Sequence, residues 1–156
     1  MSLRVGLGVD AHAFADGVPL VLGGVTFDSP RGLAGHSDGD VITHALIDAV
    51  LGAADLGDIG SLFPSDGSTP LGVSSLDLLR DAVAQVRGAG YAVVNADCIL
   101  IGEQPRIADR RVEMGEVLSA LVGAPVNVRA TTTDGLGFTG RREGLAAQAV
   151  ALVERS

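Results

Sequence analysis

Apolar residues recur at helical spacing between residues 40 and 54. Ile42, Leu46 and Val50 fall on one face, and Asp40 is suited to cap the start of a helix. A polar stripe of Asp40, His44 and Asp48 runs along the opposite side at intervals of four residues, and later turns of that side also carry apolar residues. The pattern therefore predicts a helix over about 40–54 that is buried on two sides, with polar groups between them.

Similar patterns predict the other elements. Strands are expected at 3–9, ending at Asp10, and at 91–101 and 126–131, with a hairpin or two short strand pieces at 18–22 and 25–27. Further helices are expected from Ser74 or Ser75 to Gly88 or Gly90, from Pro105 as a first helical residue to about Gly123, and at the end of the chain on Leu145, Ala146, Ala149, Leu152 and Val153.

The alternation of strands and helices indicates an α/β (α+β) two-layer sandwich, with a mixed four- to five-stranded sheet and helices on one face. A length of 156 residues with 47% hydrophobic residues suits one domain spanning 1–156. A sheet covered on one side leaves its other face to be buried elsewhere, so we expect an oligomer.

Charge and composition exclude several partners. The net charge of −8, with 11 basic residues and 3% aromatic residues, argues against nucleic-acid binding. The chain has no apolar run of 18 residues and its first residues do not resemble a signal peptide, so we expect no membrane association and a cytoplasmic location. An acidic protein that handles phosphates needs arginines, helix ends or bound cations for charge compensation.

The three histidines are the main candidates for chemistry. Asp10 and His12 lie two residues apart on a predicted extended segment, so their side chains point to the same side. Together with His44 they would form a set of two histidines and one carboxylate with an open position, which is typical of catalytic zinc. The alternative for His44 is an ordinary helical histidine. His36 and Ser37 precede the helix start, where an anion is favoured.

Two long polar loops complete the pattern. The loop at 57–75 is either a lid or substrate rim, or a solvated connection. The loop at 131–144 offers hydroxyls, glycine amides and two arginines to phosphate oxygens, although it lacks the P-loop ending. Its alternative interpretation is a glycine-rich turn between a strand and a helix.

Four blocks together resemble one family. DAH at 10–12, GHSDGDVITHAL at 35–46, LGDIGSLFP at 56–64 and TTTDGLGFTGRREG at 131–144 are similar in order and spacing to the 2-C-methyl-D-erythritol 2,4-cyclodiphosphate synthases of the non-mevalonate isoprenoid pathway. The resemblance spans nearly the whole chain. It implies a homotrimer with active sites between adjacent subunits, and a phosphorus-oxygen lyase acting on 4-diphosphocytidyl-2-C-methyl-D-erythritol 2-phosphate. In that reaction the 2-phosphate attacks the β-phosphorus, CMP leaves and a cyclic diphosphate forms.

The resemblance also implies roles for individual residues. Asp10, His12 and His44 would bind Zn²⁺, with a substrate phosphate oxygen in the fourth position, and Asp134 would bind a second cation, Mg²⁺ or Mn²⁺. His36 and Thr132 would stabilise the transition state. The substrate would contact Asp10, His12, His36, Ser37, Asp58, Ile59, Gly60, Phe63, Gly102, Pro105, Arg106, Ala108, Thr131, Thr132, Thr133, Asp134, Phe138 and Arg141. Within this set, 58–60 would hold the sugars, the loop from Phe63 the erythritol, and 102–108 the cytidine.

The chain departs from the common family pattern at four places. Asp134 and Gly135 replace Glu and Lys, Arg106 replaces Lys, Arg142 replaces Gly, and FPSDGSTP replaces FPDTDP. Two other functions are consistent with the residues. One is a zinc phosphodiesterase that uses water, and the other is a non-catalytic trimer that binds nucleotides or isoprenoid diphosphates.

Overall fold

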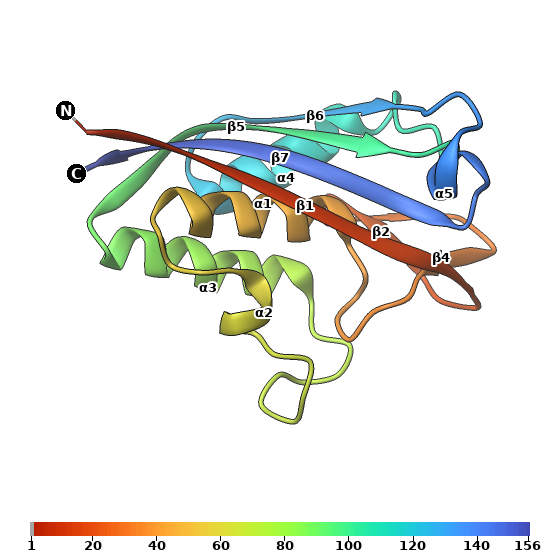
Figure 1. Ribbon diagram of the computed structural model, residues 1–156, viewed down its shortest axis with the longest axis horizontal. Helices are drawn as coiled ribbons and strands as arrows, with labels where there is room; N and C mark the ends of the chain where they lie inside the picture. Colours follow the sequence, from red (N-terminus) through yellow and green to blue (C-terminus); the bar gives the residue numbers. More distant parts are fainter. Residues whose placement is uncertain (1) are drawn as a thin grey trace.

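The computed structural model describes residues 2–156 and is built on a mixed five-stranded sheet (Figure 1). Its strand order is β4-β1-β7-β5-β6; β5 and β6 are parallel and the other neighbours antiparallel. The strands are β1 (Leu3–Asp16), β4 (Arg31–Leu33), β5 (Tyr91–Ile101), β6 (Val126–Thr131) and β7 (Gly144–Arg155), and a separate hairpin consists of β2 (Leu20–Leu22) and β3 (Val25–Phe27). The predicted mixed sheet and hairpin are therefore confirmed.

Three longer helices cover one face of this sheet, as the sequence predicted (Figure 1). They are α1 (Val41–Ala53), α3 (Ser75–Gly88) and α4 (Arg111–Val122), and two short helices are α2 (Ile59–Leu62) and α5 (Gly137–Gly140). The core lies between α1, α3, α4 and the sheet. Among residues 2–156, no helix has the length and apolar character needed to cross a membrane.

Helix α1 lies directly on the backbone of β1. A Cβ atom built on Gly6 would sit 1.9 Å from the carbonyl oxygen of Ala49, and one built on Gly8 would sit 1.9 Å from that of Ala45. Only glycine permits this approach, because the atoms that a side chain would meet are backbone atoms of a buried helix. The neighbouring strand β7 presents the small residues Ala147, Ala149 and Ala151 to the same interior.

The last element is a strand, so the predicted C-terminal helix is wrong. β7 pairs with β1 on one side and β5 on the other, in the middle of the sheet. From Ala147 onward its burial alternates, which is the strand period. Many of its buried residues are alanines, the best helix formers, and apolar residues also occupy outward positions such as Val150. Both features masked the alternation in the sequence.

Two element boundaries also differ from expectation. Strand β1 continues beyond Asp10 to Asp16, because its residues up to Ala13 still pair with β7 and its last three pair with β4. Pro105 does not open a helix: it follows a cis peptide bond in a loop, and α4 begins only at Arg111. A proline is favoured at the first position of a helix, but it is also common in loops, so the sequence did not show that Pro105 lies in the loop before α4.

The uncovered face of the sheet carries a row of apolar side chains. Along β1 the outward residues Leu3, Val5, Leu7 and Val9 are 53–67% exposed, and Val150 on β7 lies in the same layer. Side chains that alternate along a strand point to opposite faces, so this row lies opposite the glycines that contact α1. The sheet therefore has two apolar faces, one covered by helices and one open in the single chain.

We predict that Gly8→Ala destabilises the fold. The new methyl group would meet the backbone of α1, and overpacking of this kind costs about 1–3 kcal/mol of unfolding free energy. Gly52→Ala on α1 is the matched control: nothing lies within 4 Å of its added Cβ, so removing a helical glycine should stabilise the protein by about 0.5–1 kcal/mol. Urea unfolding of both variants measures the difference, and equal stability would contradict the close packing.

Candidate metal centre and substrate cavity

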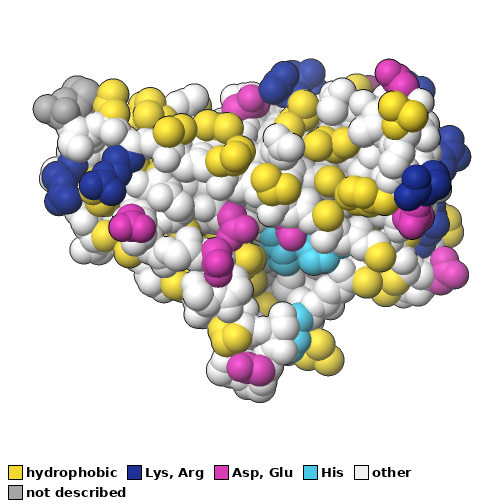
Figure 2. All heavy atoms as spheres, viewed as in Figure 1, with side chains coloured by type: hydrophobic (Ala, Val, Ile, Leu, Met, Phe, Trp, Pro, Cys, Tyr) yellow, Lys and Arg dark blue, Asp and Glu magenta, His cyan; other side chains and the backbone are white. Residues whose placement is uncertain are grey.

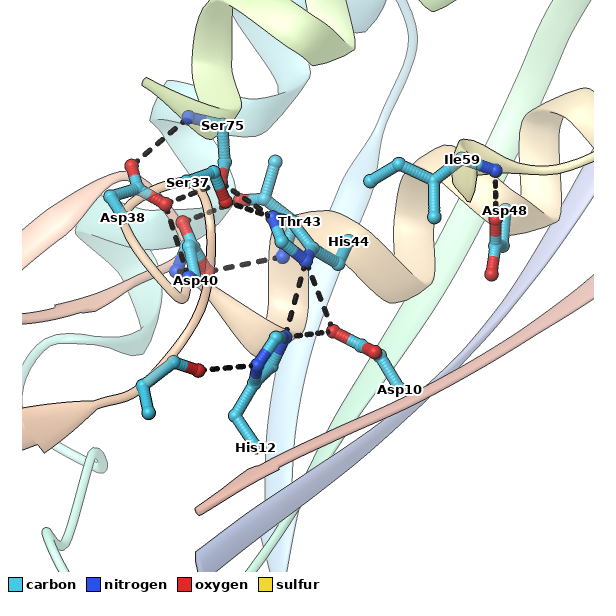
Figure 3. Close-up of polar contacts among 12 residues, drawn as sticks. Asp10, His12, Ser37, Asp38, Asp40, Thr43, His44, Asp48, Ile59 and Ser75 are labelled. Atoms are coloured by element: carbon cyan, nitrogen blue, oxygen red, sulfur yellow. Dashed lines mark hydrogen bonds and ion pairs between the residues drawn. The ribbon is translucent and has the colours of Figure 1, made fainter. Parts of the chain in front are cut away.

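Asp10, His12 and His44 converge on one point between β1 and α1 (Figure 3). The Oδ2 atom of Asp10 lies 2.7 Å from Nε2 of His12 and 3.1 Å from Nδ1 of His44, and the two nitrogens are 3.3 Å apart. Asp10 and His12 share one side of β1, while His44 is the fourth residue of α1. The geometry confirms that these three residues form a cluster.

Hydrogen bonds on the far side of each ring fix its direction. Nδ1 of His12 donates to the carbonyl oxygen of Ala34 at 2.7 Å, which leaves Nε2 to face the cluster. Nε2 of His44 lies 2.9 Å from the hydroxyl of Ser37 and 2.8 Å from that of Ser75, which leaves Nδ1 to face the cluster. Histidines that bind metals are commonly oriented in this way by a hydrogen bond to the other ring nitrogen.

Asp10 and His12 stabilise each other's charged form. Burial would raise the pKa of Asp10, but hydrogen bonds and charge interactions with His12 and His44 outweigh it and lower this pKa to about 2. Burial would lower the pKa of His12, yet the hydrogen bond and the negative charge of Asp10 raise it above its ordinary value. An ionised carboxylate is thus held against two imidazole nitrogens.

This donor set fits a divalent transition metal. Donors bound to a tetrahedral zinc ion lie about 3.3 Å from one another, and the three cluster distances are similar or slightly shorter. One carboxylate oxygen and two imidazole nitrogens leave an open position, which distinguishes catalytic from structural zinc sites. The three residues can therefore hold a metal without a change of fold.

The cluster lies in a cavity of about 180 Å³. Figure 2 shows histidine side chains on both sides of a hollow between the sheet and a projecting loop. Besides the cluster, the cavity is lined by His36, Ser37, Ile59, Gly60, Phe63, Ser65, Thr69 and Leu78. Several predicted substrate contacts from two sequence blocks thus meet beside the metal ligands.

His36 connects this cavity to the loop between α2 and α3. Its Nε2 atom donates to the carbonyl oxygen of Thr69 at 2.6 Å, and its own carbonyl oxygen accepts from the amide of Gly72. Phe63, Ser65 and Thr69 of the same loop line the cavity. The loop is therefore a rim of the cavity rather than a remote solvated connection.

Three nearby aspartates have structural contacts. Asp40 is fully buried and accepts hydrogen bonds from Gly23, Gly24 and Thr43, so it caps α1 and ties the β2–β3 hairpin to it. Asp48 accepts from the amide of Ile59 at 2.7 Å, and Asp58 caps α2 through the amide of Ser61. Burial raises the pKa of both Asp40 and Asp48.

A second cavity, of about 290 Å³, lies at the other predicted substrate segments. It is lined by Gly102, Glu103, Pro105, Arg106, Ile107, Ala108, Arg111, Ala130, Thr131 and Thr132. Arg106 and Arg111 give it positive groups, whereas the first cavity has a carboxylate and histidines. The predicted cytidine segment therefore shares one cavity with Thr131 and Thr132, whereas the predicted Thr133 does not line it.

The single chain does not join the two halves of the predicted site. His36 lines the first cavity and Thr132 the second, and no hydrogen bond connects them within residues 2–156. Asp134 bonds to the hydroxyl of Thr132 at 3.2 Å. Arg141 pairs with Glu143 at 2.6 Å, and neither Arg141 nor Phe138 lines either cavity.

Sequence reasoning missed Ser75 and gave no role to Asp38. The hydroxyl of Ser75 bonds to both His44 and Asp38, at the first turn of α3. The sequence offered only the signal of a helix start at residue 74 or 75, because the contact spans 31 positions of the chain. A serine at a helix start is ordinarily interpreted as a cap.

The YgbB family model matches residues 3–154 of this chain. A protein of Rubrobacter xylanophilus, named 2-C-methyl-D-erythritol 2,4-cyclodiphosphate synthase, is 54% identical over 159 residues, which cover 98% of this chain and 96% of that protein. A protein of Syntrophobacter fumaroxidans with the same name is 51% identical over 97% of both chains. Similarity to these proteins extends over nearly the whole sequence.

Solved structures of similar proteins share the fold. The bifunctional IspDF of Campylobacter jejuni superposes with a TM-score of 0.95 at 37% identity, covering 99% of this chain and 43% of that longer chain. A 2C-methyl-D-erythritol-2,4-cyclodiphosphate synthase in a CDP-bound form has a TM-score of 0.87 at 36% identity, covering 97% of this chain and 100% of that one.

We predict that His44→Ala abolishes binding of a divalent metal, because it removes one of three converging donors. His36→Ala is the matched control, since His36 lines the same cavity but bonds to Thr69 and not to the cluster. Elemental analysis of both purified variants after metal loading gives the metal content, and circular dichroism checks the fold. Full metal occupancy in His44→Ala would refute the ligand assignment.

Proposed function

Because this chain belongs to the YgbB family, we propose that it cyclises 4-diphosphocytidyl-2-C-methyl-D-erythritol 2-phosphate to 2-C-methyl-D-erythritol 2,4-cyclodiphosphate and releases CMP. Relatives about half identical in sequence carry this synthase name over nearly their full length. The chain is on this basis a phosphorus-oxygen lyase of isoprenoid biosynthesis. Solved relatives with CDP support a substrate that contains a cytidine diphosphate.

One observation carries the proposal: Asp10, His12 and His44 converge in a cavity that His36 and Ser37 also line. A diphosphate needs positive charge and fixed donors around its oxygens, and this cavity can supply both once a cation is bound. The proposed reaction requires no nucleophilic side chain from the protein, because the 2-phosphate of the substrate is the nucleophile.

The proposed resident metal is Zn²⁺, held by Asp10, His12 and His44. When bound, it supplies Lewis-acid polarisation of a phosphate oxygen and a fixed template for the diphosphate. The protein holds these ligands in position with hydrogen bonds from His12 to Ala34 and from His44 to two serines. Phosphoryl transfer depends mainly on such alignment and on charge neutralisation.

The other predicted residues act on the substrate itself. Nε2 of His36 donates to the carbonyl oxygen of Thr69, so its Nδ1 atom remains to accept from the hydroxyl of Thr132 of another subunit. Ile59, Gly60 and Phe63 line the cavity where the sugar portions would lie. Arg106 in the second cavity would contact the cytidine phosphates, since it replaces the usual lysine with another cation.

A homotrimer would unite the two cavities. In one chain they lie apart, and His36 does not meet Thr132 within residues 2–156. The open face of the sheet carries the exposed apolar row of Leu3, Val5, Leu7 and Val9, which association would bury. We therefore place the metal half of each site on one subunit and the nucleotide half on its neighbour.

The remaining assignments stay predictions. Asp134 would bind a second cation, Mg²⁺ or Mn²⁺, and Asp58, Thr131, Thr133, Phe138 and Arg141 would complete the substrate contacts. Residues 1–156 would form one domain, and the protein would act in the cytoplasm. The geometry of Asp134 suits a role near Thr132, because the two side chains are hydrogen-bonded.

Incubation with the diphosphocytidyl substrate tests the reaction. We expect CMP and a cyclic diphosphate in equal amounts by mass spectrometry, and loss of both when a chelator removes the metal, because three protein ligands alone leave the diphosphate charge uncompensated. Restoring Zn²⁺ should restore product, with His44→Ala as the control that does not respond. Linear bisphosphate products would instead identify a hydrolase.

Val5→Glu should dissociate the trimer and abolish activity, because it places a charge within the apolar row of the open sheet face. Val112→Glu is the matched control: Val112 is 69% exposed on α4 and Val5 67% exposed on β1, but only Val5 lies on that face. Sedimentation velocity and CMP release measure the two effects. A Val5→Glu protein that remains trimeric would rule out this face as the interface.

A further inference from the structure

The side chain of Ser75 links His44 to Asp38 in a short chain of buried hydrogen bonds (Figure 3). The Ser75 hydroxyl lies 2.8 Å from Nε2 of His44 and also contacts Oδ1 of Asp38. Ser75 is completely buried, and His44 is 8% exposed. Three residues from the segment before α1, from α1 itself and from the start of α3 thus form one connected group.

The proton positions in this chain follow from the partners of Asp38. Its carboxylate also accepts from the amides of Ser75 and Asp40, at 3.0 and 3.1 Å, so all its contacts are with donors. A carboxylate can only accept, and therefore the Ser75 hydroxyl donates its proton to Asp38. The oxygen of Ser75 then presents a lone pair to His44, whose Nε2 atom must carry a proton.

This arrangement decides which nitrogen of His44 can bind a metal. With a proton on Nε2, the lone pair of the neutral ring lies on Nδ1, the atom that faces Asp10 and His12. We propose that Asp38 and Ser75 are positioning residues that fix the ring nitrogen and the orientation with which His44 binds the metal. The proposal rests on the proposed function, because it takes His44 as a metal ligand.

Ser75 is not a nucleophile in this arrangement. In a nucleophilic triad the histidine stands between the acid and the serine and removes the serine proton. His44 does lie between Asp10 and Ser75 here, but the proton of Ser75 points to Asp38, so Nε2 of His44 does not accept it. The complete burial of Ser75 also keeps it from any substrate.

Ser37 has a different role from Ser75, although the two hydroxyls lie at similar distances from His44. Its hydroxyl lies 2.9 Å from the same Nε2 atom, but it is half-buried and lines the substrate cavity. No carboxylate fixes the Ser37 hydroxyl within residues 2–156, so its proton can point to a phosphate oxygen while Ser75 holds His44. Ser37 is therefore available for contact with substrate, whereas Ser75 positions His44.

The chain also ties the metal site to the rim of the cavity. Ser75 is the first residue of α3 and directly follows the loop that carries Phe63 and Thr69. Asp38 holds both the amide and the hydroxyl of Ser75. The end of the rim loop is thus anchored to the same group that orients a metal ligand.

Zinc affinity tests the proposal with a matched pair of variants. Ser75→Ala should weaken Zn²⁺ binding about 10- to 100-fold in a chelator competition, as loss of a partner behind a metal ligand commonly does. Ser74→Ala should bind Zn²⁺ like the wild type, because Ser74 precedes α3 without a side-chain hydrogen bond. Thermal unfolding of the metal-free proteins separates a loss of stability from a loss of affinity. Unchanged zinc affinity in Ser75→Ala would overturn the proposal.

A double-mutant cycle tests whether Asp38 acts through Ser75. Asp38→Asn should weaken zinc binding in the wild type and have little further effect in Ser75→Ala, because the chain is already broken there. Additive losses would show that Asp38 acts separately and would overturn the linked chain.

Nitrogen NMR of the zinc-loaded wild type gives a readout that needs no substitution. We expect the His44 ring to bind zinc through Nδ1 and to retain a slowly exchanging proton on Nε2. Zinc bound through Nε2 would overturn the proposal even if Ser75→Ala failed to fold. A wild-type protein that binds no zinc would instead refute the proposed metal site. Zinc affinity that is normal in the wild type and unchanged in Ser75→Ala would refute only the positioning role of Asp38 and Ser75.

Discussion

The close contact between α1 and two glycines of β1 is the constraint on which the site depends. Gly6 and Gly8 let the carbonyl groups of Ala49 and Ala45 rest on the strand, at distances that any side chain would prevent. Asp10 and His12 continue the same strand, and His44 precedes Ala45 on the helix. Donor atoms from two elements can approach within 3.3 Å only because their backbones are so close. The packing of the core and the geometry of the metal centre are therefore one feature.

Two carboxylates near this contact, the buried Asp40 and the half-buried Asp10, have different roles because their neighbours differ. Asp40 accepts four hydrogen bonds from backbone and hydroxyl donors, and it holds the hairpin and the first turn of α1 together. Asp10 instead has two imidazole rings beside one oxygen; burial is the largest single effect and would raise its pKa, but the hydrogen bonds and charges of the two rings together outweigh it and lower the pKa to about 2. A carboxylate with all its lone pairs occupied is structural, whereas one with converging nitrogens is prepared for a cation.

Local signals in the sequence predicted some features and not others. Asp40 and the spacing of Ile42, Leu46 and Val50 indicated α1. The spacing of Asp10 and His12 indicated that their side chains lie on the same side of a strand. Both patterns involve residues that are close together along the chain. The strand β7 was mistaken for a helix because its alanines favour helices and its pairing partners lie far away in sequence. Ser75 was missed for the same reason: its two partners lie 31 and 37 positions away.

The loop after β6, in which Asp134 and Gly135 depart from the family resemblance, is held by contacts of its own backbone. Asp134 and Gly135 both have positive φ angles, 53° and 82°, and glycine accommodates the second without strain. The amide of Gly135 donates to Glu103 at 2.9 Å, which joins this loop to the segment beside Arg106. The two arginines of this loop, Arg141 and Arg142, do not line the cavity beside Arg106, and Arg141 pairs with Glu143, so Arg106 and Arg111 are the cations of its lining. An anion that enters this cavity therefore meets its positive partners at Arg106 and Arg111, where the chain leads into α4, rather than on the loop that follows Thr132.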